Sequence, residues 1–156
     1  MTFKEQFAAN NGDPIEVDGI RISPLYELSI PVDADLRISI TSSADWAVQG
    51  IRARIRSGEM SVGKTRSDDF VFWHDTAPPS FSVRIWRASA MTRVRIRNIW
   101  RSDSGEIVHA WSGNSGMIVE GDPFADRGAI FRCASLNETA AMTFDDVVFR
   151  ASVNYL

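Results

Sequence analysis

A chain of 156 residues fits one domain of ordinary size, and its 44% of hydrophobic residues exclude a disordered chain. The net charge of −3 does not favour a nucleic acid as partner. Cys133 is the only cysteine, which excludes an internal disulfide.

The N-terminal segment lacks the apolar core of a secretion signal, and no segment is apolar over the length that spans a bilayer. We therefore expect a soluble, cytoplasmic protein without a transmembrane segment.

The elements predicted along the chain are a short helix followed by many strands. Phe3 and Phe7 lie one turn apart, which favours a helix over residues 2–9. Apolar and polar residues then alternate with the period of a strand. The predicted strands are 15–22, 26–32, 35–41, 50–57, 69–74, 80–87, 92–101, 106–111, 116–120, 128–134 and 143–153. Turn residues separate them, so we expect an all-β, antiparallel, jelly-roll-like sandwich that forms one domain over residues 1–156.

The middle of the chain predicts a three-strand meander made of 80–87, 92–101 and 106–111. Pairing the first two strands sets Ile85 opposite Val94. A turn over 102–105 then sets Asn98 opposite His109. These registers keep apolar residues on one face, whereas a slip by one residue would mix the two faces.

The other face of this predicted meander is rich in arginine. Its members are Arg84, Trp86, Arg93, Arg95 and Arg97, and strand 50–57 could add Arg52, Arg54 and Arg56. Like charges opposed across strands repel, so solvent, acidic side chains, a partner surface or a bound anion must offset them. Trp86 could stack on Arg93 or offer a flat platform to a sugar ring. Two interpretations remain open: a solvated face whose arginines pair with acids from neighbouring strands, and a ligand or partner face.

A second candidate is the polar pair Asn98 and His109, which the meander places inward between Trp100 and Trp111. Buried polar groups need partners, and these two could satisfy each other within the core. Alternatively, they could form the floor of a pocket that orients a polar ligand between indole walls.

Signatures of catalysis and of metal binding are weak. His74 and Asp75 are adjacent, and adjacent residues of a strand point to opposite faces. With two histidines and one cysteine, a closed zinc site is not expected. We expect no enzyme and no cofactor, although acidic pairs at strand ends could hold a structural calcium ion. These pairs are Asp33/Asp35, Asp68/Asp69, Asp122/Asp126 and Asp145/Asp146.

The run from Met142 to Arg150 reads Met-Thr-Phe-Asp-Asp-Val-Val-Phe-Arg. It resembles the closing strand of jelly-roll carbohydrate-binding modules, which often end with an apolar-Asp-Asp-Val-apolar run. The resemblance implies a jelly-roll sandwich and, by analogy of fold, a glycan ligand.

The favoured function is a non-catalytic module that binds a carbohydrate or a small anionic ligand through the Arg/Trp face. Alternatives are a structural protein, an enzyme with a pocket between its sheets, and a membrane-active β-sandwich toxin whose tryptophans sit at the lipid interface. The structural alternative draws on charge: residues 51–101 carry +7 and the remainder −10. Such a division could support head-to-tail contact between copies and hence a homo-oligomer.

Overall fold

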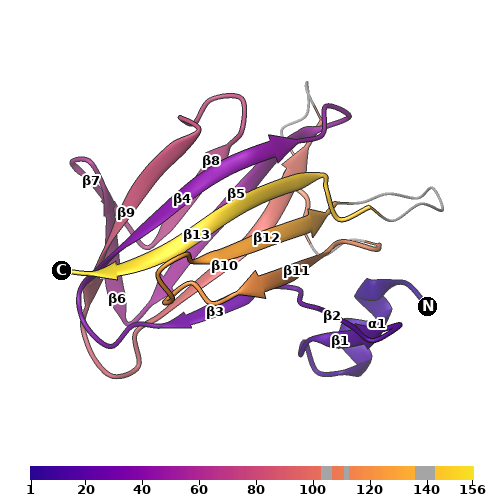
Figure 1. Ribbon diagram of the computed structural model, residues 1–156, viewed down its shortest axis with the longest axis horizontal. Coiled ribbons are helices and arrows are strands. Elements are labelled where there is room, and N and C mark those ends of the chain that lie inside the picture. The colour runs from indigo at the N-terminus through magenta and orange to yellow at the C-terminus, as the bar shows by residue number, and fades with distance from the viewer. Residues whose placement is uncertain (103–106, 111–112, 136–142) are drawn as a thin grey trace.

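The computed structural model describes residues 1–102, 107–110, 113–135 and 143–156 and consists almost entirely of antiparallel strands (Figure 1). Two sheets pack face to face, which confirms the predicted all-β sandwich. The predicted N-terminal helix is also present as α1 (Phe3–Ala9). The Thr2 hydroxyl caps it by accepting a hydrogen bond from the Glu5 amide at 3.2 Å.

A small hairpin follows the helix. It consists of β1 (Ile15–Val17) and β2 (Ile20–Ile22), where the sequence had predicted one strand over 15–22. The chain reverses at Asp18 and Gly19, whose φ angles are 52° and 79°. Two consecutive positive φ angles are those of the tightest hairpin turn, for which Asp-Gly is a preferred sequence.

The larger sheet has the strand order β11-β12-β13-β4-β9-β6-β7. Its strands are β4 (Ala34–Ser43), β6 (Gly58–Val62), β7 (Thr65–Ser67), β9 (Ser80–Arg87), β11 (Gly116–Gly121), β12 (Ala129–Ala134) and β13 (Val147–Tyr155). The sequence pattern did not predict β6 and β7. Both are short, and Gly58 and Gly63 interrupt the alternation there.

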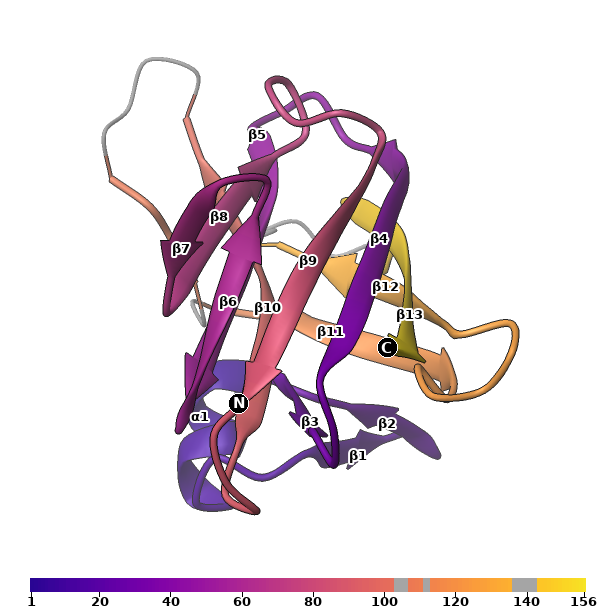
Figure 2. The same ribbon diagram turned by 90° about the vertical axis from the view of Figure 1, so that its left-hand side faces the viewer.

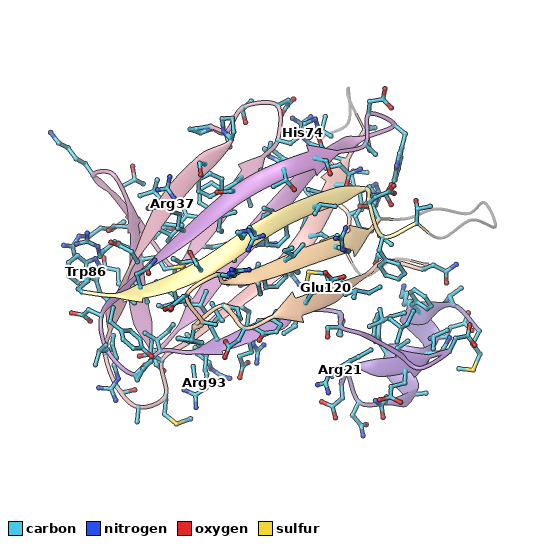
Figure 3. All side chains as sticks on the ribbon, viewed as in Figure 1. Arg21, Arg37, His74, Trp86, Arg93 and Glu120 are labelled. Carbon is cyan, nitrogen blue, oxygen red and sulfur yellow. The ribbon has the colours of Figure 1, made fainter. Side chains whose placement is uncertain are left out.

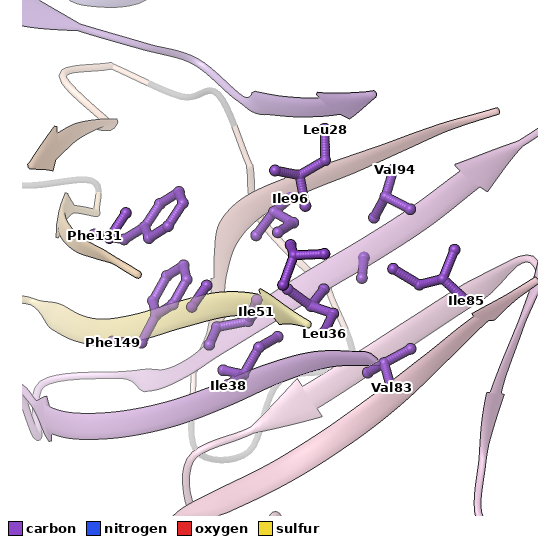
Figure 4. Close-up of a cluster of buried hydrophobic side chains, with 14 of the residues drawn as sticks. Leu28, Leu36, Ile38, Ile51, Val83, Ile85, Val94, Ile96, Phe131 and Phe149 are labelled. Atoms are coloured by element: carbon purple, nitrogen blue, oxygen red, sulfur yellow. The ribbon is translucent and has the colours of Figure 1, made fainter. Parts of the chain in front are cut away.

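The smaller sheet has the order β3-β10-β5-β8, built from β3 (Tyr26–Ser29), β5 (Val48–Arg56), β8 (Asp69–Trp73) and β10 (Arg93–Arg101). The inward residues of both sheets form the core (Figure 4). Phe131 and Phe149 stack there with their ring centroids 4.6 Å apart. Phe72 of β8 stacks on Phe81 of β9 at 4.2 Å, so that one aromatic contact joins the two layers.

The predicted hairpin between 80–87 and 92–101 is wrong, because β9 and β10 belong to different sheets. Ile85 lies opposite Ala34 and Met60, not opposite Val94. Figure 2 shows β9 beside β4, with β10 behind them in the other layer. The inward faces of both strands are nevertheless apolar and buried, as the alternation predicts.

The link between β9 and β10 explains the change of sheet. The buried Thr92 accepts hydrogen bonds from the amides of Ala88 and Ser89 at 3.1 and 3.2 Å. Its own hydroxyl donates to the carbonyl of Ser57. Ser57 lies between β5 of one sheet and β6 of the other. The link is therefore tied to the point where the chain passes between the layers.

The predicted register beyond β10 is also wrong. His109 pairs with Trp100 through reciprocal backbone hydrogen bonds of 3.1 and 2.8 Å, whereas Asn98 was expected opposite it. The partner of His109 therefore lies two residues further along β10 than the turn over 102–105 predicts. Part of the predicted strand 106–111 and Trp111 lie outside the described residues.

Candidate anion-binding face

The arginines predicted to share one face divide between the two sheets. Arg84 and Trp86 lie on β9 in the larger sheet, whereas Arg93, Arg95 and Arg97 lie on β10 in the smaller one. The single face predicted from the hairpin is therefore wrong in its membership. The arginines of β10 lie opposite the arginines of β5 and not opposite Arg84 of β9.

Three arginine pairs face each other directly across β10 and β5. The register sets Arg93 opposite Arg56, Arg95 opposite Arg54, and Arg97 opposite Arg52. We call these six residues the Arg face. The alternate residues of both strands, such as Ala53 and Ile96, are completely buried in the core. Packing of the apolar set thus fixes all six guanidinium groups on the outer side of the sheet.

Two carboxylates from the flanking strands lie against the Arg face. Asp69 of β8 accepts a hydrogen bond from Arg52 Nε at 2.9 Å, and Arg54 Nε is 3.8 Å from it. On the other side, Glu27 of β3 accepts from Arg95 Nε at 2.9 Å. Together with the six arginines, these carboxylates give the group of eight side chains a net charge of +4.

The charges of the face influence one another. The hydrogen bond from Arg52 holds the pKa of the Asp69 carboxyl below its ordinary value, against the opposing effect of burial. The pKa of the Arg97 guanidinium is lowered, first by burial and then by repulsion from Arg52 and Arg54. Arginine remains protonated at neutral pH despite such a shift, so this repulsion persists in the folded protein.

The guanidinium groups line an open groove of about 380 Å³. The residues around it are Leu25, Ile55, Arg54, Arg56, Arg93, Arg95 and Arg97. The side chains of Arg54 and Arg95 remain 57% and 51% exposed, so their donors can reach a ligand. A concave surface lined by cationic fork-shaped donors is suited to phosphate, sulfate or carboxylate groups.

The ion pair between Arg52 and Asp69 predicts an acid-sensitive contribution to stability. Because the folded-state pKa of Asp69 is depressed, its contribution is complete above the unfolded-state pKa and is lost as pH falls through the folded-state value. We expect the wild-type protein to lose more unfolding free energy than Asp69→Asn below about pH 4. Urea unfolding at a series of pH values measures this difference, and parallel pH profiles for the two proteins would contradict it.

Trp86 and Arg84 form a separate cluster on the outer side of the larger sheet. Arg84 Nε lies 2.6 Å from the Asp35 carboxylate. The guanidinium carbons of Arg84 and Arg66 lie 5.5 and 5.8 Å from the centre of the Trp86 ring. These two guanidinium groups thus compete with a sugar for the Trp86 ring. Arg93, on which Trp86 was expected to stack, lies apart from it in Figure 3.

The second predicted site does not assemble. Asn98 is buried and donates to the Ala134 carbonyl at 3.1 Å, while the His109 ring stacks on Trp100 at 5.9 Å. Trp111, the fourth expected member, lies outside the described residues. The partners of Asn98 belong to a buried polar cluster that sequence reasoning missed, in which the Ser135 hydroxyl donates to Gln49 Oε1 at 2.7 Å. Nothing in the local pattern links positions so distant along the chain.

Several of the residues considered for catalysis or for metal binding have protein partners. His74 Nδ1 lies 3.0 Å from the backbone carbonyl of Gln49. Asp146 accepts from Trp46 Nε1 at 2.9 Å, and Asp122 accepts from the Phe124 amide at 2.9 Å. Within the part of the chain that the structure describes, no three His, Cys, Asp or Glu side chains gather as metal ligands.

Among residues 1–102, 107–110, 113–135 and 143–156, no helix combines the length and apolar character needed to cross a membrane. Comparison of the chain with protein-family models, with curated proteins and with solved structures found no match.

Proposed function

We propose that this protein is a non-catalytic binding module whose Arg face takes an anionic ligand. The observation that supports the proposal is the set of three directly opposed arginine pairs on β5 and β10. Directly opposed like charges destabilise a sheet. The aliphatic stems of arginines can cover apolar surface, but uncharged side chains could do the same, so packing alone does not account for the guanidinium groups. A function that uses the charges accounts for their presence in this arrangement.

The spacing of a sheet suits such a ligand. Adjacent strands lie about 4.8 Å apart, and residues on one face of a strand repeat about every 6.8 Å. One phosphate or sulfate group can therefore be reached by both arginines of a pair, and neighbouring pairs can hold further groups. Each guanidinium can also present two parallel donors to one anion. A bound anion would offset the repulsion that Arg52 and Arg54 exert on Arg97.

Self-association through the Arg face is the second candidate, because the rest of the chain is acidic. The whole chain carries −3 and the Arg face with its two carboxylates +4, which leaves −7 for the other residues. An acidic surface of a second copy could then occupy the face. This contact and a small anion would compete for the same arginines.

Calorimetric titration with tripolyphosphate tests the proposal. We expect binding at low ionic strength that weakens markedly at roughly 0.15 M salt, where the screening length is about 8 Å. The control is Arg37→Ser combined with Arg84→Ser, which removes two arginines from the outer side of the larger sheet. This control should bind as the wild type does.

Two outcomes would count against anion binding at the Arg face. One is absence of binding at low salt. The other is loss of binding in the Arg37/Arg84 control, which would place the site on the larger sheet. Light scattering in the same buffers distinguishes the second candidate function, self-association, from binding of a small anion. A particle mass that doubles at low salt and falls on addition of tripolyphosphate would assign the face to self-association.

A further inference from the structure

The groove of the Arg face continues into a second hollow. This hollow has a volume of about 770 Å³, and Leu25 and Arg95 line both it and the groove. Its floor includes the connection from Arg21 of β2 to Glu27 of β3. Arg93 and Arg21, which lie toward opposite ends of this path, both project along the lower side of the molecule in Figure 3.

The far wall of the hollow is held firmly. Ser23 and Met117 exchange backbone hydrogen bonds of 2.8 and 2.9 Å, which join the end of β2 to β11. A Cβ atom added to Gly116 would come within 2.6 Å of Ile22 Cγ2, so β11 and β2 are in close contact. On the helix, the Phe3 amide donates to the Asn114 side chain at 3.1 Å. The hollow is therefore a preformed feature between docked elements.

The chemistry of the second hollow differs from that of the Arg face. Among its described lining residues, Arg21 and Arg95 are balanced by Asp13 and Glu27. Its remaining polar lining comes from side chains such as Asn11 and from exposed backbone. A uniformly charged polyanion would meet carboxylates here. A neutral, hydroxyl-rich group would instead find donors and acceptors of both kinds.

Tyr26 gives the hollow an aromatic wall with a polar end. Its ring packs edge-on against Phe131 of the core at 5.3 Å, which fixes its orientation. Burial and the charge of Asp122 raise the pKa of its hydroxyl, while Arg21 lowers it. The hydroxyl is thus within electrostatic reach of charges at the hollow. A half-buried ring with a directed hydroxyl suits the apolar face and hydroxyl groups of a sugar.

On the basis of the proposed function, we propose that the ligand is an acidic oligosaccharide. Its sulfate or carboxylate group would bind the Arg face, and its uncharged sugar portions would occupy the hollow beside Tyr26. Leu25, which lines both cavities, marks the junction between the two portions. The two halves of the ligand therefore depend on different residues and can be tested separately.

The experiment compares a chondroitin sulfate tetrasaccharide with tripolyphosphate on the wild type and on Tyr26→Phe. Loss of one hydrogen-bonding hydroxyl should weaken tetrasaccharide binding roughly threefold to tenfold and leave tripolyphosphate binding unchanged. Tyr155→Phe is the matched control, because Tyr155 is 57% exposed on β13 and does not line the hollow. Asn11→Gly is a second variant of a residue that lines the hollow. Glycine tolerates the φ of 57° at this position, so the change removes the side chain without straining the backbone.

Each outcome separates the two proposals. Suppose that both probes bind, and that the Tyr26 and Asn11 variants leave both affinities unchanged or lower both by the same factor. The oligosaccharide inference then fails, and anion binding stands. If tripolyphosphate binds and the tetrasaccharide does not, the inference likewise fails. If neither probe binds at low salt, the proposed function fails and the inference with it. Thermal unfolding of each variant checks that the fold is retained.

Discussion

Replacing Arg54 and Arg95 together by serine is expected to weaken tripolyphosphate binding about tenfold. These two residues form the central opposed pair and are both about half exposed. An exposed charge contact contributes about 0.2–1 kcal/mol, so loss of two contacts removes up to about 2 kcal/mol. A tenfold change corresponds to about 1.4 kcal/mol and lies within this range. Calorimetric titration of the double variant beside the wild type measures it.

The same double variant should fold normally. Arg52 still bonds Asp69, and Arg93 remains 3.8 Å from Glu27, so neither carboxylate is left without a cation. Removal of the opposed charges should leave the free energy of unfolding unchanged or slightly raised. A double variant that unfolds would instead show that these arginines hold the sheet together. Unchanged affinity in a folded variant would remove the central pair from the binding site.

Replacing Phe149 by alanine is expected to destabilise the protein by about 3–5 kcal/mol. Phe149 is fully buried and stacks on Phe131 between the two sheets. The change removes apolar surface and leaves a cavity in a core that close packing does not readily refill. Urea unfolding monitored by tryptophan fluorescence gives the difference in free energy.

The matched control is Tyr155→Ala on the same strand, where the ring is 57% exposed. We expect a loss within about 1 kcal/mol, because truncation of an exposed side chain leaves no cavity. Equal losses in the two variants would mean that the buried middle of β13 and its exposed end are not distinguished as described. A small loss in both would mean that the aromatic stack contributes little.

Alternation predicts which side chains are inward more reliably than it predicts strand neighbours. Val83, Ile85 and Ile96 are all fully buried, as their period of two requires. The same period is satisfied whether two consecutive strands pair in one sheet or face each other across the core. The choice involves contacts between residues far apart in sequence, such as the hydrogen bond from Thr92 to Ser57.

The candidate site shows the same limit. The sequence places Arg52, Arg54 and Arg56 on one side of their strand but cannot say which strand lies opposite. Their pairing with the arginines of β10 is a consequence of sheet order. Likewise, Asp69 is recognisable as an acidic residue, and its role as the partner of Arg52 follows only from the neighbouring position of β8. Local pattern thus supplies the charges, and tertiary arrangement supplies their grouping.

The position of β13 has a consequence for how the chain folds. This strand, Val147–Tyr155, lies in the middle of the larger sheet, between β12 and β4. β4 begins at Ala34, so its central pairing must wait until more than a hundred further residues have been synthesised. A nascent chain that has not yet released β13 leaves the edges of β4 and β12 exposed to unwanted partners. Such non-local closure favours folding in milliseconds to seconds once β13 is available, rather than stepwise folding as each strand emerges.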